Sequence, residues 1–599
     1  MVPVVASTPV PVEICIGQKE LTEPRLSPDG RHLGWMVARA GVVALVVCEL
    51  ATDERRSYVL EAGLRGGRSM GGGSWTWMPD GREVIVAGAD GALWSLPLDG
   101  AAPRPWFSPG DGRAAWSPWV ADSEGSPLVV CTVDQAEVWA SDGSASWRLD
   151  DGSADFVSDP CIVNGRAWWT AWDVPSMPWD AARLESVSAV VGVSEPGRAT
   201  RTGTGAVQQP RPHPDGRMTC VRDDDGWNNV WLDDRPLVPE PFEHAGPPWG
   251  PGARSFAWSP DGQRLAFTRN EGGFGRLCVW SVDGVAEIAR GVHGQLSWQG
   301  EHLAALRTGA RTPTEVVVLD TTTWERRVLD VGPESAWADR RESIAEPELW
   351  TIGEVHARVY LTDTTTPVRG AIVWLHGGPT DQWQVTFMPR VEYWRSRGWN
   401  IVVPDHRGST GHGREYAQAL RGLWGELDVT DTLDVVAAVH QRGLAAPATT
   451  VVFGGSAGGL TALEAACRRP DVLAGVAVAY PVTDLADLSA RSHRFEAHYT
   501  VGLVGPLPET RDLHDQRSPV MHPELIRGVP VLILHGDADP VVPVDHSRAF
   551  AAAARAAGAD VTLHEYPGEG HGFRDAANQR DEYLRLGAFL DRVVPSGQG

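Results

Sequence analysis

The sequence TTVVFGGSAGGLTALEAACRRPD, residues 449–471, joins three local patterns within one short stretch. Its β-branched and aromatic residues predict a strand, and the Ala- and Leu-rich run that follows predicts a helix. Between them lies GGSAG, residues 454–458, which fits the G-x-S-x-G pattern of a nucleophile elbow. Alone, this pentapeptide also fits a tight turn built from small residues. With a strand before it and a helix after it, the pattern predicts that Ser456 is a catalytic nucleophile.

The surrounding sequence predicts the fold that such an elbow requires. Short apolar runs, nearly continuous, alternate with helical segments such as DTLDVVAAVHQRG and SRAFAAAARAAG. Strands that are apolar on both faces and alternate with helices indicate a parallel sheet covered on both sides. We therefore expect an α/β-hydrolase catalytic domain over residues 335–599. The apolar runs are GAIVWLHGG (370–378), WNIVVPDHRG (399–408), GVAVAYP (475–481) and PVLILHGDADP (530–540).

A nucleophilic serine needs a base, and the base needs a group that orients it. In this fold the three follow in the order Ser, then Asp or Glu, then His. Asp537 and Asp539 end an apolar strand, and His571 lies between two glycines after the next strand-like segment. Of the two aspartates, Asp539 is the favoured partner of His571. Asp537 is expected to cap the loop instead. His564 falls inside the strand, where a structural role is expected.

An oxyanion hole is expected at HGGP, residues 376–379, which follows a predicted strand. Glycine lets backbone N–H groups approach the developing oxyanion closely, and one such donor contributes about 3 kcal/mol to transition-state stabilisation. The expected donors are the N–H groups of Gly378 and Ala457. The alternative interpretation of this tetrapeptide is a plain turn at the end of a strand.

The first half of the chain carries a loose repeat of the form aromatic-x-Pro-Asp-Gly. Pro-Asp-Gly is a turn motif, and the alternating apolar run after it predicts a strand. A repeat of about 40–50 residues, with one four-stranded sheet per repeat, is typical of the blades of a β-propeller. Residues 25–330 are therefore predicted to hold six to eight blades, with seven as the best estimate. Residues 1–24 form an N-terminal extension, a candidate for packing on the hydrolase domain. The four clear repeats start at Leu26, Trp77, Pro212 and Trp258.

The composition narrows the classes of partner. A formal net charge of −24 argues against binding to nucleic-acid phosphates, so no nucleic-acid partner is expected. Seven scattered cysteines without a C-x-x-C pair favour a reducing compartment and argue against a zinc site. Residues 1–17 lack the basic region of a signal peptide, and no run of about 18 apolar residues occurs. We therefore expect a cytoplasmic protein that has no membrane association, no bound metal and no cofactor. The sequence leaves its oligomeric state open.

A β-propeller followed by this hydrolase domain resembles the prolyl oligopeptidase family of serine peptidases, over nearly the whole chain. The resemblance rests on HGGP, DHRGSTGHG, GLWGELDVTD, GGSAGG, HGDADPVVP and GEGHGF, which follow in the family's order. It implies a triad of Ser456, Asp539 and His571. Two branches of the family have a tyrosine where this chain has His376, and the tyrosine hydroxyl helps to form their oxyanion hole. The sequence is therefore more similar to the acylaminoacyl-peptidase and bacterial aminopeptidase branch, including puromycin-hydrolysing aminopeptidases.

The same resemblance suggests a substrate pocket in SHRFEAHYTVGLVG, residues 492–505. In related enzymes this region helps to bind the residue before the scissile bond, so Phe495 and Tyr499 are pocket candidates. Glu496 is a candidate partner for a substrate ammonium group. The alternative for all three is helix packing or an ion pair with a nearby arginine.

The expected function is a serine exopeptidase, of the aminopeptidase or acylaminoacyl-peptidase type, for short peptides or aminoacyl amides. An esterase or amidase that acts on a small metabolite or a peptide-like antibiotic would use the same triad. A propeller scaffold with an inactive hydrolase domain is a third alternative. The sequence leaves open the exact substrate, the need for a free or acylated N-terminus, and endo- or exo-cleavage.

Overall fold

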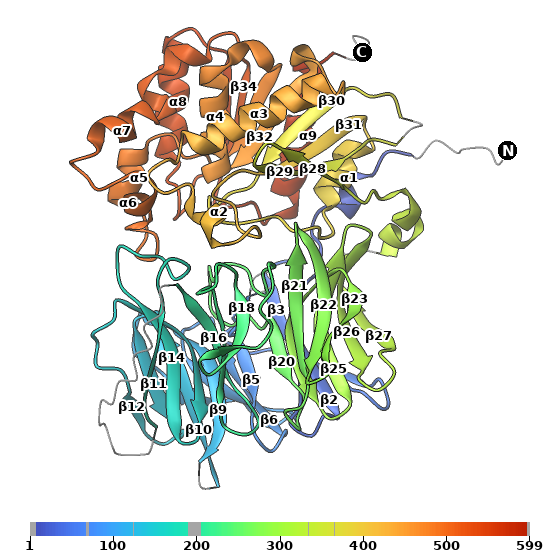
Figure 1. Ribbon diagram of the computed structural model, residues 1–599, viewed down its shortest axis with the longest axis vertical. Helices are drawn as coiled ribbons and strands as arrows, with labels where there is room; N and C mark the ends of the chain where they lie inside the picture. The colour runs from blue at the N-terminus through green and yellow to red at the C-terminus, as the bar shows by residue number, and fades with distance from the viewer. Residues whose placement is uncertain are drawn as a thin grey trace, which may run out of the picture. The chain divides into compact units, whose positions relative to one another are not determined.

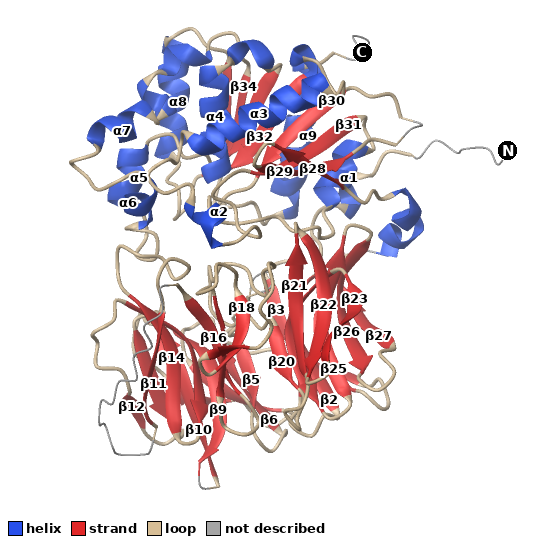
Figure 2. Ribbon diagram, in the orientation of Figure 1, coloured by secondary structure: helices blue, strands red, loops and turns tan. Residues whose placement is uncertain are grey.

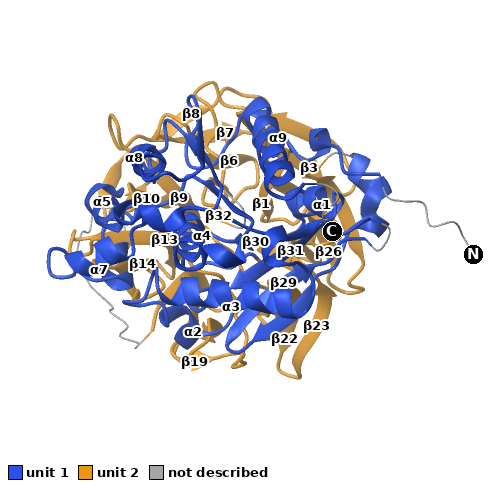
Figure 3. Ribbon diagram, turned by 90° about the horizontal axis from the view of Figure 1, so that it is seen from above, with its two compact units in different colours: residues 1–18, 335–383, 387–599 blue, residues 19–334, 384–386 orange. Residues whose placement is uncertain are grey.

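The computed structural model describes residues 8–67, 71–123, 125–189, 205–333, 335–363 and 366–595. The chain divides into two compact units, coloured separately in Figure 3. The propeller unit comprises Lys19–Glu334 and Gln384–Thr386, and the α/β unit comprises Met1–Gln18, Ser335–Trp383 and Phe387–Gly599. Within the described residues the propeller unit is built of strands and loops, whereas the α/β unit contains helices as well (Figure 2).

The propeller unit contains seven antiparallel sheets in its described residues, which confirms the predicted seven blades. Sheet β13–β15 has three described strands and the other sheets have four. In chain order the strands are β1 (Glu20–Leu26), β2 (His32–Arg39), β3 (Val42–Glu49), β4 (Arg55–Tyr58); β5 (Trp75–Trp77), β6 (Glu83–Ala87), β7 (Leu93–Pro97), β8 (Arg104–Phe107); β9 (Ala115–Ser123), β10 (Ser126–Val133), β11 (Glu137–Ser141), β12 (Ser146–Arg148); β13 (Phe156–Val163), β14 (Arg166–Trp172), β15 (Arg183–Ser188); β16 (Val207–Pro212), β17 (Met218–Arg222), β18 (Asn229–Leu232), β19 (Arg235–Pro236); β20 (Phe256–Trp258), β21 (Leu265–Glu271), β22 (Phe274–Ser281), β23 (Gly284–Arg290); β24 (Val292–Gln299), β25 (His302–Gly309), β26 (Thr312–Asp320) and β27 (Arg326–Val331).

The Pro-Asp-Gly motifs form the turns between the first and second strands of four blades. In the turn between β1 and β2, Gly30 has φ +71°, and its N–H donates to the carbonyl of Ser27 at 2.8 Å. The Asp29 carboxylate accepts the N–H of Arg31 at 3.0 Å. The aspartate and the glycine of each motif thus have the roles that their chemistry predicts. The same contacts recur around Gly81, Gly216 and Gly262.

The propeller begins earlier than the sequence predicted. The expected boundary between residues 24 and 25 falls inside β1, because Glu20–Leu26 pairs with β2 as the first strand of blade 1. The short helix η1 (Val12–Ile14) belongs instead to the α/β unit. There Val12 is buried in the cluster that also contains Leu586 and Phe589.

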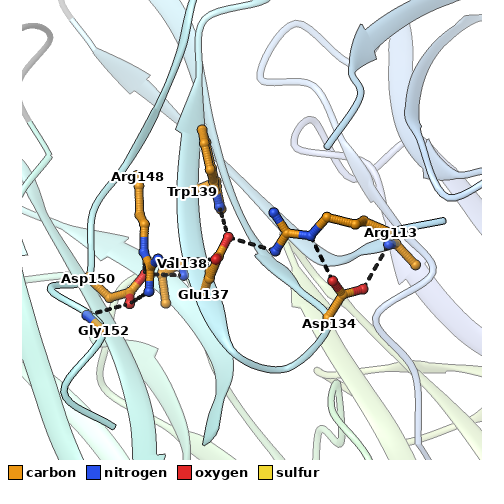
Figure 4. Close-up of polar contacts among 9 residues, drawn as sticks. Arg113, Asp134, Glu137, Val138, Trp139, Arg148, Asp150 and Gly152 are labelled. Carbon is orange, nitrogen blue, oxygen red and sulfur yellow. Dashed lines mark hydrogen bonds and ion pairs between the residues drawn. The ribbon is translucent and has the colours of Figure 1, made fainter. Parts of the chain in front are cut away.

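Charged side chains connect the strands of the third blade (Figure 4). Arg113 donates to Asp134 at 2.9 Å and to Glu137 at 2.7 Å. Arg148 donates to the other oxygen of Glu137 at 3.0 Å and to Asp150 at 2.6 Å. Glu137 therefore bridges two arginines, which ties β11 and β12 to the loop before β9.

The α/β unit contains one eight-stranded sheet, in the order β28-β29-β31-β30-β32-β33-β34-β35. The pairs β28–β29 and β29–β31 are antiparallel and the remaining neighbours are parallel. Its strands are β28 (Glu348–Ile352), β29 (Val355–Tyr360), β30 (Gly370–Leu375), β31 (Trp399–Asp405), β32 (Thr450–Gly455), β33 (Gly475–Ala479), β34 (Val531–Gly536) and β35 (Val561–Tyr566). Its helices are α1 (Pro389–Arg395), α2 (Arg414–Gln418), α3 (Leu427–Gln441), α4 (Ala457–Arg468), α5 (Leu485–Arg491), α6 (Tyr499–Leu503), α7 (Arg511–Gln516), α8 (Asp545–Ala556) and α9 (Ala576–Val593).

Helices cover both faces of this sheet, as the doubly apolar strands predict (Figure 1). Successive residues of a strand point to opposite faces. In β30, Ala371, Val373 and Leu375 pack in the cluster that receives α3, α4 and α8. Ile372 and Trp374 pack in the cluster that receives α1 and α9. The loops that carry the candidate site follow the carboxyl ends of the parallel strands.

A fully buried ion pair joins β29 to β31. Arg358 and Asp405 are both 0% exposed, and both guanidinium Nη atoms donate to the Asp405 carboxylate. His412 and Gln382 also contact Asp405, at 2.8 and 2.7 Å. The pair lowers the pKa of Asp405 although burial alone would raise it. The carboxylate thus stays charged inside the protein because four nitrogen contacts stabilise it.

We predict that Asp405→Asn lowers the free energy of unfolding by about 3–5 kcal/mol, because it leaves the buried charge of Arg358 without a counter-charge. A loss of this size lowers the melting temperature by about 5–10 °C. Differential scanning calorimetry of the full chain at neutral pH measures it. Asp471→Asn is the matched control, since Asp471 also pairs with an arginine but is exposed. Equal melting temperatures for both variants would contradict the prediction.

Candidate active site

Ser456 lies at the junction between β32 and α4, in a backbone conformation that non-glycine residues rarely adopt. Its φ and ψ are 55° and −122°. Its side chain makes no capping hydrogen bond to α4, so the hydroxyl is not used to stabilise the helix. Strained backbone of this kind is typical of the turn that presents a nucleophile at the end of a strand.

The neighbouring glycines are required by close contacts. A Cβ atom on Gly454 would lie 2.2 Å from the carbonyl oxygen of Gly458. A Cβ on Gly458 would lie 2.5 Å from the carbonyl oxygen of His376. Both separations are shorter than a van der Waals contact allows, so side chains at these positions would force β32, α4 and β30 apart. The glycines are structural, and they hold Ser456 beside the HGGP loop.

His571 contacts Asp539 directly. The Nδ1 atom of His571 lies 2.7 Å from Oδ2 of Asp539. Because a carboxylate accepts, Nδ1 carries the proton and the other ring nitrogen, Nε2, keeps the lone pair that a general base needs. Burial raises the pKa of Asp539, but hydrogen bonds from His535 and His571 outweigh it, so the pKa is lowered overall. The carboxylate therefore remains charged at neutral pH.

The two candidate aspartates have different partners in the loop after β34. Asp539 accepts the N–H groups of Val541 and Val542 at 2.8 and 3.0 Å, which fix its orientation. Asp537 accepts the N–H of Gly568 at 2.7 Å, so it braces the loop that precedes His571. The structure thus brings His571 to Asp539 and gives Asp537 the loop contact that was its alternative role.

Two side chains of this site were not identified from the sequence. Glu569, buried two residues before His571, accepts the N–H groups of Arg574 and Asp575, both at 2.9 Å. The ring of Tyr480, just after β33, has its centroid 4.5 Å from that of His571. A Cβ on Gly455 would lie 3.1 Å from the same tyrosine ring. The Tyr480 ring therefore packs against both the elbow and the imidazole.

The HGGP loop lies beside the elbow. A Cβ on Gly377 would be 3.5 Å from the Cβ of Ser456. Gly378 has φ +120°, in the region that glycine tolerates at no steric cost. Ala457 is the first residue of α4, where an N–H has no partner within the helix. Neither the N–H of Gly378 nor that of Ala457 donates to another described residue, so both are available to an oxyanion.

His376 has a structural role in this loop. It is 0% exposed, and its Nδ1 donates to the carbonyl of Gly377 at 2.7 Å. Its Nε2 therefore accepts from the hydroxyl of Ser409, also at 2.7 Å. Burial lowers the pKa of His376 to about 3, so the ring is neutral at physiological pH. With both ring nitrogens engaged, the side chain orients the loop and leaves oxyanion binding to backbone donors.

The three predicted pocket residues lie at or just before α6. The hydroxyl of Tyr499 donates to Oγ1 of Thr380 at 2.6 Å and accepts the Thr380 N–H at 3.1 Å. Tyr499 thus links α6 to the residue that follows HGGP. Glu496 lies 3.4 Å from Nε2 of His493 and raises the pKa of that histidine. The side chain that Glu496 contacts is therefore a histidine, whereas the alternative interpretation gave it a nearby arginine. Phe495 is half-buried.

No cluster of three or more His, Cys, Asp or Glu side chains in the described part of the chain has the arrangement that holds a metal ion. Among the helices that the structure describes, none combines the length and the apolar character needed to cross a bilayer.

Comparison with known proteins gives the same architecture. The chain aligns over 99% of its length, and over 98% of the other chain, with the structure of a Mycobacterium tuberculosis puromycin-hydrolyzing peptidase, with a TM-score of 0.88 and 26% identity. It is 31% identical over 229 residues to dipeptidyl peptidase family member 6 of Caenorhabditis elegans, which is 37% of this chain and 31% of that protein. It is 26% identical over 228 residues to the acylamino-acid-releasing enzyme of Arabidopsis thaliana, 36% of this chain and 29% of that protein.

The alignments with these two curated relatives span less than a third of each relative's length. A family model described as the prolyl oligopeptidase family matches residues 385–596. This region contains the elbow, Asp539 and His571 in the family's order, and it is preceded by a seven-bladed propeller. Residues 385–596, the region that carries the candidate triad, therefore form the catalytic region of a prolyl oligopeptidase family serine peptidase.

Proposed function

We propose that the protein is a serine exopeptidase, of the aminopeptidase or acylaminoacyl-peptidase type, that hydrolyses short peptides or aminoacyl amides. The contact that carries the proposal is the 2.7 Å hydrogen bond between His571 and Asp539, beside the strained elbow at Ser456. This arrangement leaves the lone pair of His571 Nε2 free, at the same edge of the sheet as a serine hydroxyl that does not cap its helix. General base, orienting carboxylate and nucleophile are the three parts that acyl transfer requires.

In the proposed reaction, the Ser456 Oγ attacks the scissile carbonyl while His571 takes the hydroxyl proton. Asp539 holds the imidazole in the required tautomer and stabilises its charged form. The negative charge on the substrate oxygen is stabilised by the N–H groups of Gly378 and Ala457. His571 then protonates the leaving amine, and a water molecule hydrolyses the acyl-enzyme by the same steps in reverse order. The proton returns to Ser456 at the end, so no group is consumed.

A second candidate substrate class is a small aminoacyl amide such as an antibiotic. It is favoured by the similarity to the puromycin-hydrolyzing peptidase, which extends over almost the whole of both chains. Puromycin is itself an aminoacyl amide, so a peptidase with an exopeptidase pocket has the chemistry to cleave it. The triad would act identically on both substrate classes, and only the pocket would distinguish them.

A hydrolysis panel tests the proposed function. It compares free and N-acetylated arylamides of Ala, Leu, Phe and Pro with simple aryl esters, and adds puromycin as a separate substrate. We expect arylamides to be cleaved with a clear preference between the free and the acetylated series, because an exopeptidase must recognise the end of its substrate. Turnover of plain esters in strong preference to every amide would replace the peptidase proposal with an esterase. Cleavage of puromycin at a rate similar to the best arylamide would support the second candidate class.

A further inference from the structure

The axis of the propeller is lined by polar side chains that the catalytic proposal does not use. The first strands of neighbouring sheets contact one another, as β1 does with β24, β9 with β13 and β13 with β16. Five of these strands carry a non-glycine residue with positive φ at a shift in pairing register, which is a β-bulge. These residues are Glu23, Ser117, Asp159, Gln209 and Gln295, with φ between 50° and 55°, and each is more than nine-tenths buried.

The two carboxylates at this axis already have partners. Glu23 accepts from Arg25 at 3.0 Å and from the N–H groups of Gly73 and Ser74 at 2.9 and 3.0 Å. Asp159 accepts the N–H of Gly252 at 2.6 Å. Its second oxygen lies 3.7 Å from an Nη of Arg211. Each carboxylate thus balances one arginine.

A third arginine at the axis has no such partner. No carboxylate pairs with Arg254 within the described residues, and its Nε atom is buried without a hydrogen bond. Its guanidinium carbon lies 5.5 Å from the ring centroid of Trp119, and that of Arg211 lies 5.6 Å from the same ring. Two like charges therefore flank one indole. Burial holds the pKa of Arg254 well below its ordinary value, and the charges of Arg25 and Arg211 lower it further.

Other buried donors at the axis also lack acceptors. The Nε atoms of Arg25 and Arg211 and the hydroxyl groups of Ser74 and Ser117 are buried without hydrogen-bond partners in the described structure. Both Nη atoms of Arg25 and of Arg211 already donate to protein oxygens. Unpaired buried donors and the uncompensated, half-buried charge of Arg254 each cost free energy unless a ligand satisfies them.

We propose that Arg25, Arg211 and Arg254 form a binding site for a small monovalent anion, with chloride as the expected occupant. Three arginines and two carboxylates leave one positive charge, which one monovalent anion neutralises. The donors left without an acceptor are single N–H and O–H groups from several strands, which suits a spherical ion better than a flat carboxylate. Such an anion would stabilise the propeller by joining the first strands of different blades.

The experiment measures the melting temperature of the full-length protein in chloride and in gluconate at equal ionic strength. An anion that binds only the folded state raises the melting temperature, by about 2–4 °C at saturating concentration. We expect this rise in the natural protein and not in Arg254→Met. In gluconate, Arg254→Met should melt at a higher temperature than the natural protein, because it removes a half-buried charge that has no counter-ion.

Arg264→Met is the matched control. Arg264 also stacks on a tryptophan of the propeller, with its guanidinium carbon 4.9 Å from the Trp298 ring centroid, and it donates to the carbonyl of Thr321 at 3.0 Å. This variant should keep the full chloride effect. A crystal grown in bromide provides a second readout that needs no variant, since an anomalous peak between the three arginines would locate the ion. Equal melting temperatures in both salts together with no bromide peak would mean that water alone fills the site, and would overturn the proposal.

Discussion

Replacing Ser456 by Ala is expected to lower kcat for the best aminoacyl-arylamide by about 10⁶-fold, because the variant has no hydroxyl to form the acyl-enzyme. The oxyanion donors at Gly378 and Ala457 and the substrate pocket stay in place, so weak residual catalysis above the uncatalysed rate is expected. Steady-state kinetics measure the loss, with controls for the activity of contaminating peptidases. The same variant should no longer be labelled by a fluorophosphonate probe.

Ser343→Ala is the control for this experiment, since Ser343 is an exposed serine of the same unit that donates to the carbonyl of Arg340. It should keep full activity and full labelling. Alanine and serine have a similar energetic cost at positive φ, so Ser456→Ala should not change the folding of the elbow. The circular dichroism spectra and melting curves of both variants should therefore match those of the natural protein. Normal turnover by Ser456→Ala would show that the nucleophile is elsewhere in the chain.

The elbow was predictable from sequence because its requirements are local. A strand, two glycines in close contact and a helix all lie within residues 449–471, and each leaves its own pattern. The pairing of His571 with Asp539 rather than Asp537 was favoured but not decided by the sequence. Both aspartates follow the same strand, and only the contact of Asp537 with Gly568 shows that it serves the loop.

Glu569 and Tyr480 illustrate what the sequence could not show. Glu569 acts by accepting backbone N–H groups from residues up to six positions away, and this requires a loop shape that no residue type specifies. Tyr480 reaches His571 because β33 and β35 end at the same edge of the sheet. Its role depends on strand order, whereas its sequence context is an ordinary apolar run.

The start of the propeller was missed for a physical reason. In β1 the bulge at Glu23 interrupts the alternation of inward and outward side chains that marks a strand. A signal was nonetheless present: EPRLSPDG, residues 23–30, and QPRPHPDG, residues 209–216, share the pattern P-R-x-x-P-D-G. The prolines follow the bulged residues, and the arginines of the two segments are Arg25 and Arg211. The repeat that indicates blades therefore extends upstream into the strands at the axis.

Replacing Asp539 by Asn is expected to lower kcat by about 10³–10⁴-fold with little change in folding, because the two side chains have nearly the same shape. The amide can present its N–H₂ group to Nδ1 of His571, which favours the tautomer that carries its proton on Nε2. That tautomer has no lone pair with which to take the proton of Ser456. The fall should appear in kcat and in kcat/KM alike, since the lost interaction belongs to the transition state.

Asp537→Asn is the matched control, because it changes the same functional group in the same loop. An amide oxygen still accepts the N–H of Gly568, so this variant should keep activity within about threefold of the natural protein, as expected for a residue that only braces the loop. The two variants together decide which carboxylate orients the base. A larger loss for Asp537→Asn than for Asp539→Asn would reverse the assignment. Equal, small losses would mean that His571 is oriented mainly by its own loop, through Glu569 and Tyr480, and that the 2.7 Å contact with Asp539 contributes little to catalysis.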